Sequence, residues 1–166
     1  MTFTVVKWVD LFTRPEYKDV IIDALNFCIK NKGLNVYAWV LMSNHLHLIA
    51  DCSKPFILSN FIRDFKRHTS ITISKLIIDL PESRREWMLE IFNKEALRSG
   101  RAKHFKLWKD DNHAIWLGDI DIWGKVNYIH QNPVNAQIVQ SSEQYLYSSA
   151  RDYNGLESLV EIRKLD

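Results

Sequence analysis

The chain begins with a strand pattern that gives way to a helix pattern. Residues Phe3 to Trp8 are β-prone and apolar on both faces, which predicts a central strand over 3–8. A helix is expected next, because Thr13 suits an N-cap and Glu16, three residues later, completes a capping box. Gly33 predicts its end. Apolar residues recur in this helix at intervals of three and four and predict one buried stripe, formed by Val20, Ile21, Ala24, Leu25, Cys28 and Ile29.

Two further strands and a long helix follow. The stretches 34–42 and 45–50 are β-prone and are separated by the turn formers Ser43 and Asn44, so we expect a hairpin. Residues 55–78 have the apolar spacing of a long amphipathic helix, with basic residues on one flank.

The second half of the chain is less regular. A last long helix is expected from Asp119 to His130, because Asn132 precedes Pro133 and the residue before a proline is pushed out of helical geometry. The tail from Ser141 should be loop with short turns. Between the long helices only short elements are predicted, namely a helix over 85–92 and strands over 105–108 and 114–117.

The predicted order of elements is strand, helix, strand, strand, helix, strand, helix. This order is typical of an α+β fold, a ferredoxin-like antiparallel sheet with helices packed mainly on one face. A length of 166 residues with 46% hydrophobic residues suits one core. We therefore expect a single domain over 1–166, with a core of about 3–150 and a short C-terminal tail.

The N-terminal residues, the lack of a long apolar stretch and the cysteines lead us to expect a cytoplasmic protein. The first residues lack the basic start and apolar run of a signal peptide, and no stretch approaches the ~18 apolar residues of a membrane span. Cys28 and Cys52 are too far apart for a CxxC redox pair, and we expect them to be small apolar residues of the core.

Charge is unevenly distributed along the chain. The net charge is only +2, yet residues 63–109 carry 12 Lys and Arg against 6 Asp and Glu. A basic middle of this kind suits a face that binds a polyanion, although a solvated helix surface gives the same pattern.

Two imidazoles stand close together on the second strand of the hairpin. On a strand, His45 and His47 project from the same face while Leu46 enters the other side. Such a pair can hold one divalent ion and leave coordination positions open for water or substrate oxygens. A pair of core or surface histidines with no metal role is the alternative.

A tyrosine and an amide form a second candidate group. Tyr128 and Asn132 lie one helical turn apart and share a face. A phenol with a pKa of ~10 needs a nearby metal or base to act as a nucleophile, and the Asn132 carbonyl can serve as a third metal ligand. Alternatively, Tyr128 is a packing residue at a helix end.

Four ordered blocks of sequence are more specific than either group. YAWVLMSNHLHL, KLWKDDNH, YIHQNPVNAQIV and EQYLYSSARDYNG follow one another. In this order and spacing the chain resembles the REP-associated tyrosine transposases, relatives of the single-tyrosine transposases of insertion sequences. The resemblance implies that His45 and His47 are the metal-binding histidines of an HUH motif, that Tyr128 is the nucleophile and that Asn132 completes a site for Mg²⁺ or Mn²⁺. Asn135 and Gln137 depart from residues common in that family.

The resemblance also implies a reaction and a partner. The expected activity is cleavage and strand transfer of single-stranded DNA beside a hairpin, through a 5′-phosphotyrosine, by a monomer or a homodimer. Four aromatic residues interleave with the basic ones and are candidates for stacking on unpaired bases, although large apolar side chains more often belong to the core: Trp87, Phe105, Trp108 and Trp116. Phosphate contacts are expected from Arg63, Lys66, Arg67, Arg84, Arg85, Arg101 and Lys103.

Two other functions fit the same residues. A metal-dependent phosphodiesterase would use the histidine pair without a covalent intermediate. A domesticated hairpin-binding protein would keep the fold and no longer cut DNA.

Overall fold

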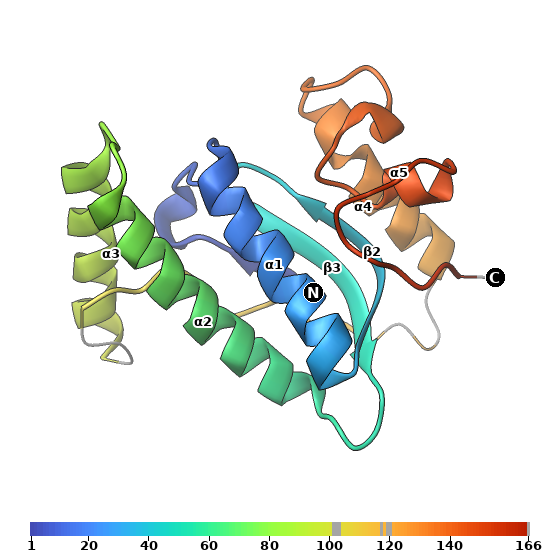
Figure 1. Cartoon of the computed structure of the whole chain (residues 1–166), viewed down its shortest axis with the longest axis horizontal. Coiled ribbons are helices and arrows are strands. Elements are labelled where there is room, and N and C mark those ends of the chain that lie inside the picture. The colour runs from blue at the N-terminus through green and yellow to red at the C-terminus, as the bar shows by residue number, and fades with distance from the viewer. Residues whose placement is uncertain (101–103, 117, 119–120, 166) are drawn as a thin grey trace.

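A three-stranded antiparallel sheet forms the centre of the computed structural model, which describes residues 1–100, 104–116, 118 and 121–165 (Figure 1). The strands are β1 (Thr2–Thr4), β2 (Leu34–Leu41) and β3 (His45–Cys52), in the spatial order β1-β3-β2. β2 and β3 form the predicted hairpin.

The segment 105–112 runs along the free side of β1. The Val6 N–H donates to the Leu107 carbonyl at 2.8 Å, and the Lys109 N–H donates to the Thr4 carbonyl at 2.8 Å. This segment therefore occupies the position of a fourth, irregular strand, as a ferredoxin-like sheet requires. The predicted strand over 105–108 is reduced to one bridge, between Val5 and Trp108. Residues 114–116 form no strand, and residue 117 lies outside the described residues.

The first strand is shorter than predicted. Strand β1 ends at Thr4, and Val6–Trp8 form a short 3-10 turn, η1, in which Lys7 and Trp8 have φ angles of 54° and 55°. The prediction failed because an apolar, β-prone sequence does not reveal where the backbone turns. Trp8 is consequently exposed, whereas Val5 and Val6 are buried.

Helices α1 (Pro15–Lys32) and α2 (Leu58–Asp79) lie side by side over one face of the sheet (Figure 1). The main core lies between them and the side chains of Leu46 and Leu48 on β3. The predicted stripe of α1 faces this core, and Gly33 ends the helix with a φ of 60°. The predicted cap is wrong, because Arg14 holds the N-cap position and no side chain caps the helix.

Helix α3 (Arg85–Ser99) packs against α2 and is longer than the predicted 85–92. Met88, Phe92 and Ala96 are buried at four-residue intervals, so the apolar stripe continues past the predicted end. Gly100, with a φ of 64°, ends the helix.

Helix α4 (Ile122–Asn135) covers the other face of the sheet. Its Val126 and Ile129 pack against Ala38, Val40 and Ile49 of the hairpin. The helix passes through Pro133, so the predicted end before the proline is wrong. A proline costs a helix one N–H donor, and close to the C-terminus that loss is tolerated. Residues 119 and 120 of the predicted helix lie outside the described residues.

The C-terminal part consists of the short turn η2 (Ser142–Gln144), helix α5 (Ala150–Tyr153) and a tail without regular structure. The tail packs on the domain, because Val160 enters the main core and the Arg163 N–H donates to the Val36 carbonyl at 2.8 Å. Cys28 is buried, Cys52 is half-buried and both thiols are free. None of the helices in the described part of the chain combines the length and apolar character of a membrane span.

Candidate active site

The two histidines of β3 face helix α4. Leu46 and Leu48 point into the main core, so the alternating side chains His45, His47 and Ile49 point to the opposite face of the sheet. The centroids of the two imidazole rings are 4.7 Å apart, and both rings are half-buried. The predicted pairing of these side chains on one face is therefore present in the structure.

Neighbouring side chains hold each imidazole at its Nδ1 atom. The Asn44 side-chain oxygen lies 2.7 Å from Nδ1 of His45, and the Thr2 hydroxyl lies 2.8 Å from Nδ1 of His47. The Asn44 amide nitrogen donates to Asp10, so the Asn44 oxygen is the atom that accepts from His45. Nε2 of His45 is then left with a free lone pair, as a metal ligand requires.

Burial keeps both imidazoles neutral. It lowers the pKa of His45. Burial, reinforced by the repulsion that a protonated His45 and the N-terminal ammonium would exert, lowers the pKa of His47 to about 4. The Asn132 side chain opposes part of this effect on both pKa values through hydrogen bonding, so it lies within reach of both rings. Neutral imidazoles are the form that binds metal ions.

Helix α4 brings Tyr128 and Asn132 to the histidines. The Tyr128 ring is 57% exposed, and its centroid lies 5.7 Å from that of His47. Asn132 donates its side-chain N–H to the Tyr128 carbonyl at 2.8 Å, which leaves its oxygen as an acceptor. No cluster of three His, Cys, Asp or Glu side chains suited to a metal occurs among the described residues. The chemistry of two imidazole nitrogens and one amide oxygen nevertheless fits a divalent ion.

A hollow of about 260 Å³ opens beside the Tyr128 ring. His47 and Tyr128 of the candidate active site line this hollow. Lys125, one helical turn before Tyr128, contributes a cation to its wall. The hollow therefore offers space and positive charge next to the phenol. Its other lining residues are Met1, Thr2, Ile49, His113, Ile115 and Ile129.

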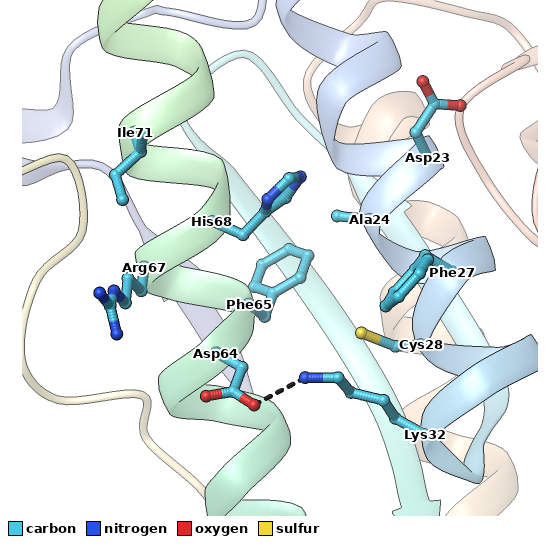
Figure 2. A pocket seen from close by; sticks show the side chains of 10 residues that line it. All are labelled: Asp23, Ala24, Phe27, Cys28, Lys32, Asp64, Phe65, Arg67, His68 and Ile71. Carbon is cyan, nitrogen blue, oxygen red and sulfur yellow. Dashed lines mark hydrogen bonds and ion pairs between the residues drawn. The ribbon is translucent and has the colours of Figure 1, made fainter.

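A second hollow, of about 530 Å³, lies between α1 and α2 on the other side of the sheet (Figure 2). The Lys32 ammonium and the Asp64 carboxylate form an ion pair of 2.7 Å at one end of it. The aromatic ring of Phe27 and the imidazole of His68 line its walls. The histidine pair and Tyr128 lie on the opposite face of the sheet, so this hollow is separate from the candidate active site.

The predicted phosphate-binding residues on α2 differ in their accessibility. Arg63 and Arg67 are exposed, and Arg63 pairs with Asp64. The Lys66 ammonium instead donates to the carbonyls of Lys109 and Asp110 at 2.6 and 3.1 Å, and burial lowers its pKa to about 8. Lys66 therefore fastens the segment 105–112 to α2.

The predicted residues after α2 are also engaged within the protein. The Arg84 guanidinium donates to the Asp10 carbonyl and to Glu82, and the Arg85 guanidinium donates to the carbonyls of Ile77 and Leu80. These contacts hold the turn between α2 and α3. Arg101 and Lys103 lie outside the described residues.

The aromatic residues predicted to stack on bases include both buried and exposed side chains. Trp108 is only 3% exposed and donates its indole N–H to Thr69, so it belongs to the core. Phe105 is half-buried against Phe92, whereas Trp87 and Trp116 are exposed.

Trp8 lies beside the histidine pair, and the sequence analysis missed it. Its ring centroid is 6.1 Å from that of His45. The apolar pattern of residues 3–8 assigned Trp8 to a central strand, and no signal in the sequence marks the turn that exposes it.

Comparisons with known proteins give one family and one solved structure. A family model described as "Transposase IS200 like" matches residues 3–132, a range that includes both histidines, Tyr128 and Asn132. A solved structure of a REP-associated tyrosine transposase bound to a REP hairpin has 18% sequence identity and a TM-score of 0.60, and the alignment covers 99% of this chain and 84% of that one. The comparison with curated proteins gave no match.

Proposed function

Because the chain belongs to the IS200-like transposase family, we propose that it is a single-tyrosine strand transferase that cuts single-stranded DNA beside a hairpin. The observation that carries the proposal is the convergence of four side chains from two elements. His45 and His47 come from β3, and Tyr128 and Asn132 come from α4.

In this proposal His45, His47 and Asn132 hold Mg²⁺ or Mn²⁺. The two imidazole ligands favour Mn²⁺, the softer of the two ions. A bound ion would supply Lewis-acid polarisation of the scissile phosphate and positive charge for the oxygens that become negative in the transition state. Asn44 and Thr2 orient the two imidazoles from outside the ligand set.

Tyr128 is the nucleophile of the proposed reaction. Its phenol oxygen forms a bond to phosphorus and loses its proton to solvent, while the bond from phosphorus to the 3′ oxygen of the preceding nucleotide breaks and that oxygen takes up a proton. The products are a 5′-phosphotyrosine and a free 3′-hydroxyl. The covalent link keeps the energy of the phosphodiester, so attack by a 3′-hydroxyl can rejoin the strand without a nucleotide cofactor.

Basic residues near the site are assigned to the DNA backbone. Lys125 lines the hollow next to Tyr128 and supplies charge for a phosphate there. Arg63 and Arg67 on α2 are exposed and are assigned to the backbone of the hairpin. In this proposal the four residues of the centre come from one chain, so a monomer carries a complete centre.

A covalent adduct assay tests the proposal. Labelled single-stranded hairpin DNA is incubated with the protein and Mn²⁺ or Mg²⁺, and the products are separated under denaturing conditions. We expect a protein–DNA adduct that is absent from Tyr128→Phe and present in the control Tyr147→Phe. Cleavage that persists in Tyr128→Phe would instead indicate a phosphodiesterase. Binding without cleavage by the unaltered protein would indicate a hairpin-binding protein.

A further inference from the structure

Trp8 is an exposed aromatic residue on an unusual piece of backbone. Its side chain is 55% exposed, and both Trp8 and the preceding Lys7 have φ angles in the left-handed region. Residues other than glycine rarely adopt this conformation, and two in succession persist only when the surroundings impose it. Such strain in an exposed aromatic residue is a reason to look for a function.

Hydrogen bonds and buried side chains impose this conformation. The Trp8 N–H donates to the Val5 carbonyl at 3.1 Å, and the Val5 N–H donates to the Asn44 carbonyl at 2.9 Å. Val5 and Val6 are buried in the main core and anchor the turn. The position of the indole is therefore fixed relative to Asn44 and His45, which belong to the candidate active site.

The indole lies at the opposite end of the histidine pair from Tyr128. Its ring contacts that of His45, whereas the Tyr128 ring contacts that of His47. The Lys109 ammonium lies over one face of the Trp8 ring, 4.0 Å from its centroid, so a stacked base would use the other face and have a cation nearby. An aromatic face next to a cation is the usual arrangement for binding an unpaired base and its phosphate.

The direction of the proposed reaction determines which base would meet Trp8. In an in-line displacement the attacking and leaving oxygens lie on opposite sides of phosphorus. Attack by Tyr128 from the His47 end therefore directs the leaving 3′ oxygen toward the His45 end, where Trp8 lies.

We propose that Trp8 stacks on the base immediately 5′ of the cleaved phosphate and that Lys109 binds the phosphate of the same nucleotide. This inference rests on the proposed function, because the side of the cut follows from attack by Tyr128. Stacking would hold the strand that ends in the new 3′-hydroxyl after cleavage. Its 3′ oxygen would then remain near the phosphotyrosine and could displace the Tyr128 oxygen in the rejoining step, with the phenol recovering a proton.

The test removes either the indole or the base. Labelled single-stranded hairpin DNA is prepared in versions that carry one abasic nucleotide at each successive position of the single strand. Fluorescence anisotropy without divalent metal gives the affinity of each version for the unaltered protein, Trp8→Leu and Trp8→Phe. Phe27→Leu serves as the control, because Phe27 is 56% exposed but lies on α1, beyond the far face of the sheet.

We expect Trp8→Leu to weaken binding of the intact DNA by about 5- to 150-fold, the range for loss of one stacked base, with Trp8→Phe and Phe27→Leu close to the unaltered protein. DNA that is abasic immediately 5′ of the mapped cut should bind the unaltered protein and Trp8→Leu equally weakly. With DNA that is abasic at any other position, Trp8→Leu should still bind more weakly than the unaltered protein, by the same factor as with intact DNA.

Two results would overturn the inference. One is an unaltered protein that loses no affinity at any abasic position, a measurement that needs no variant to fold. The other concerns Trp8→Leu. It would either bind intact DNA with the affinity of the unaltered protein, or bind every version of the DNA, abasic ones included, more weakly by the same factor. Failure of the proposed function is recognised separately, because the adduct assay then yields no Tyr128-dependent product while the abasic scan still reports whether Trp8 stacks on a base.

Discussion

At the scale of single residues, the candidate site depends on side chains that are not themselves proposed ligands. Asn44 fixes the proton of His45 on Nδ1, and Asn44 is itself held by Asp10 at 2.9 Å. The Thr2 hydroxyl bonds Nδ1 of His47 and orients that ring, although a hydroxyl can donate or accept and so does not set the tautomer. Because such partners orient a ligand and set its tautomer, their removal weakens metal binding without removing a ligand.

Asn44→Ala is expected to lower the affinity for Mn²⁺ by about 10- to 100-fold, because the His45 ring loses the acceptor that orients it. Isothermal titration calorimetry measures this directly. The control is Asn31→Ala, which removes a surface amide that bonds only to its own helix at Phe27. Equal affinities for Asn44→Ala and the unaltered protein would show that Asn44 does not orient a ligand.

Residue patterns pointed to the four side chains as two candidate groups, and the family resemblance supplied the roles expected of them. Strand periodicity puts His45 and His47 on one face, and helix periodicity puts Tyr128 and Asn132 one turn apart. Trp8 could not be identified in this way. Its exposure depends on two left-handed residues, which are dictated by packing and hydrogen bonds from distant parts of the chain.

At the scale of elements, one buried carboxylate joins α1 to the turn between α2 and α3. The Glu82 side chain is only 3% exposed and accepts hydrogen bonds from the Tyr17 hydroxyl and from Arg84. Burial by itself would raise the pKa of this carboxyl, but the hydrogen bonds from Arg84 and Tyr17 outweigh it and lower the pKa to about 2.

This pKa makes part of the stability depend on pH. The value in the folded protein lies below the ordinary 4.5, so Glu82 stabilises the fold above about pH 4.5 and loses this contribution as the pH falls toward 2. Its ionisation is expected to contribute roughly 3 kcal/mol at pH 7. Glu82→Gln should therefore lower the free energy of unfolding at pH 7 and show a weaker loss between pH 4.5 and 2.

Urea unfolding of both proteins at several pH values measures this effect. Glu90→Gln is the matched control, because Glu90 pairs with Lys94 on the exposed side of α3 and such surface pairs contribute little. If Glu82→Gln and the unaltered protein lose stability in parallel between pH 4.5 and 2, Glu82 is not the group responsible.

Most elements could be predicted because their apolar stripes are long. The hairpin, α1 and α2 each bury a regular pattern, and their types were correct. The ends were predicted less well where tertiary contacts decide them. Helix α4 packs on the hairpin through Val126 and Ile129 and continues through Pro133, after which the Ala136 N–H donates to the Asn132 carbonyl.

At the scale of the whole molecule, the sheet has the main core on one face and the candidate active site on the other. α1 and α2 bury Leu46 and Leu48 on one side, while α4 brings Tyr128 to the histidines on the other. The proposed metal site therefore links β3 to α4 across that second face, and an ion bound there should stabilise the folded chain.

Mn²⁺ at about 100 times its dissociation constant is expected to raise the melting temperature by roughly 5–10 °C, since it binds only the folded protein. His47→Ala should abolish this increase. His68→Ala should retain it, because His68 lines the hollow between α1 and α2 (Figure 2). Differential scanning calorimetry makes the comparison, and an equal increase in His47→Ala would place the ion elsewhere.

The most direct test of the whole account is mass spectrometry of the covalent product. After cleavage of hairpin DNA, digestion with nuclease and trypsin should yield a peptide spanning 126–151 that carries a nucleotide, with fragmentation locating the added mass on Tyr128. A nucleotide on Tyr145, on Tyr147 or on any residue outside this peptide would contradict the proposed centre. Cleaved DNA with a free 5′ phosphate and no linked peptide would contradict it as well.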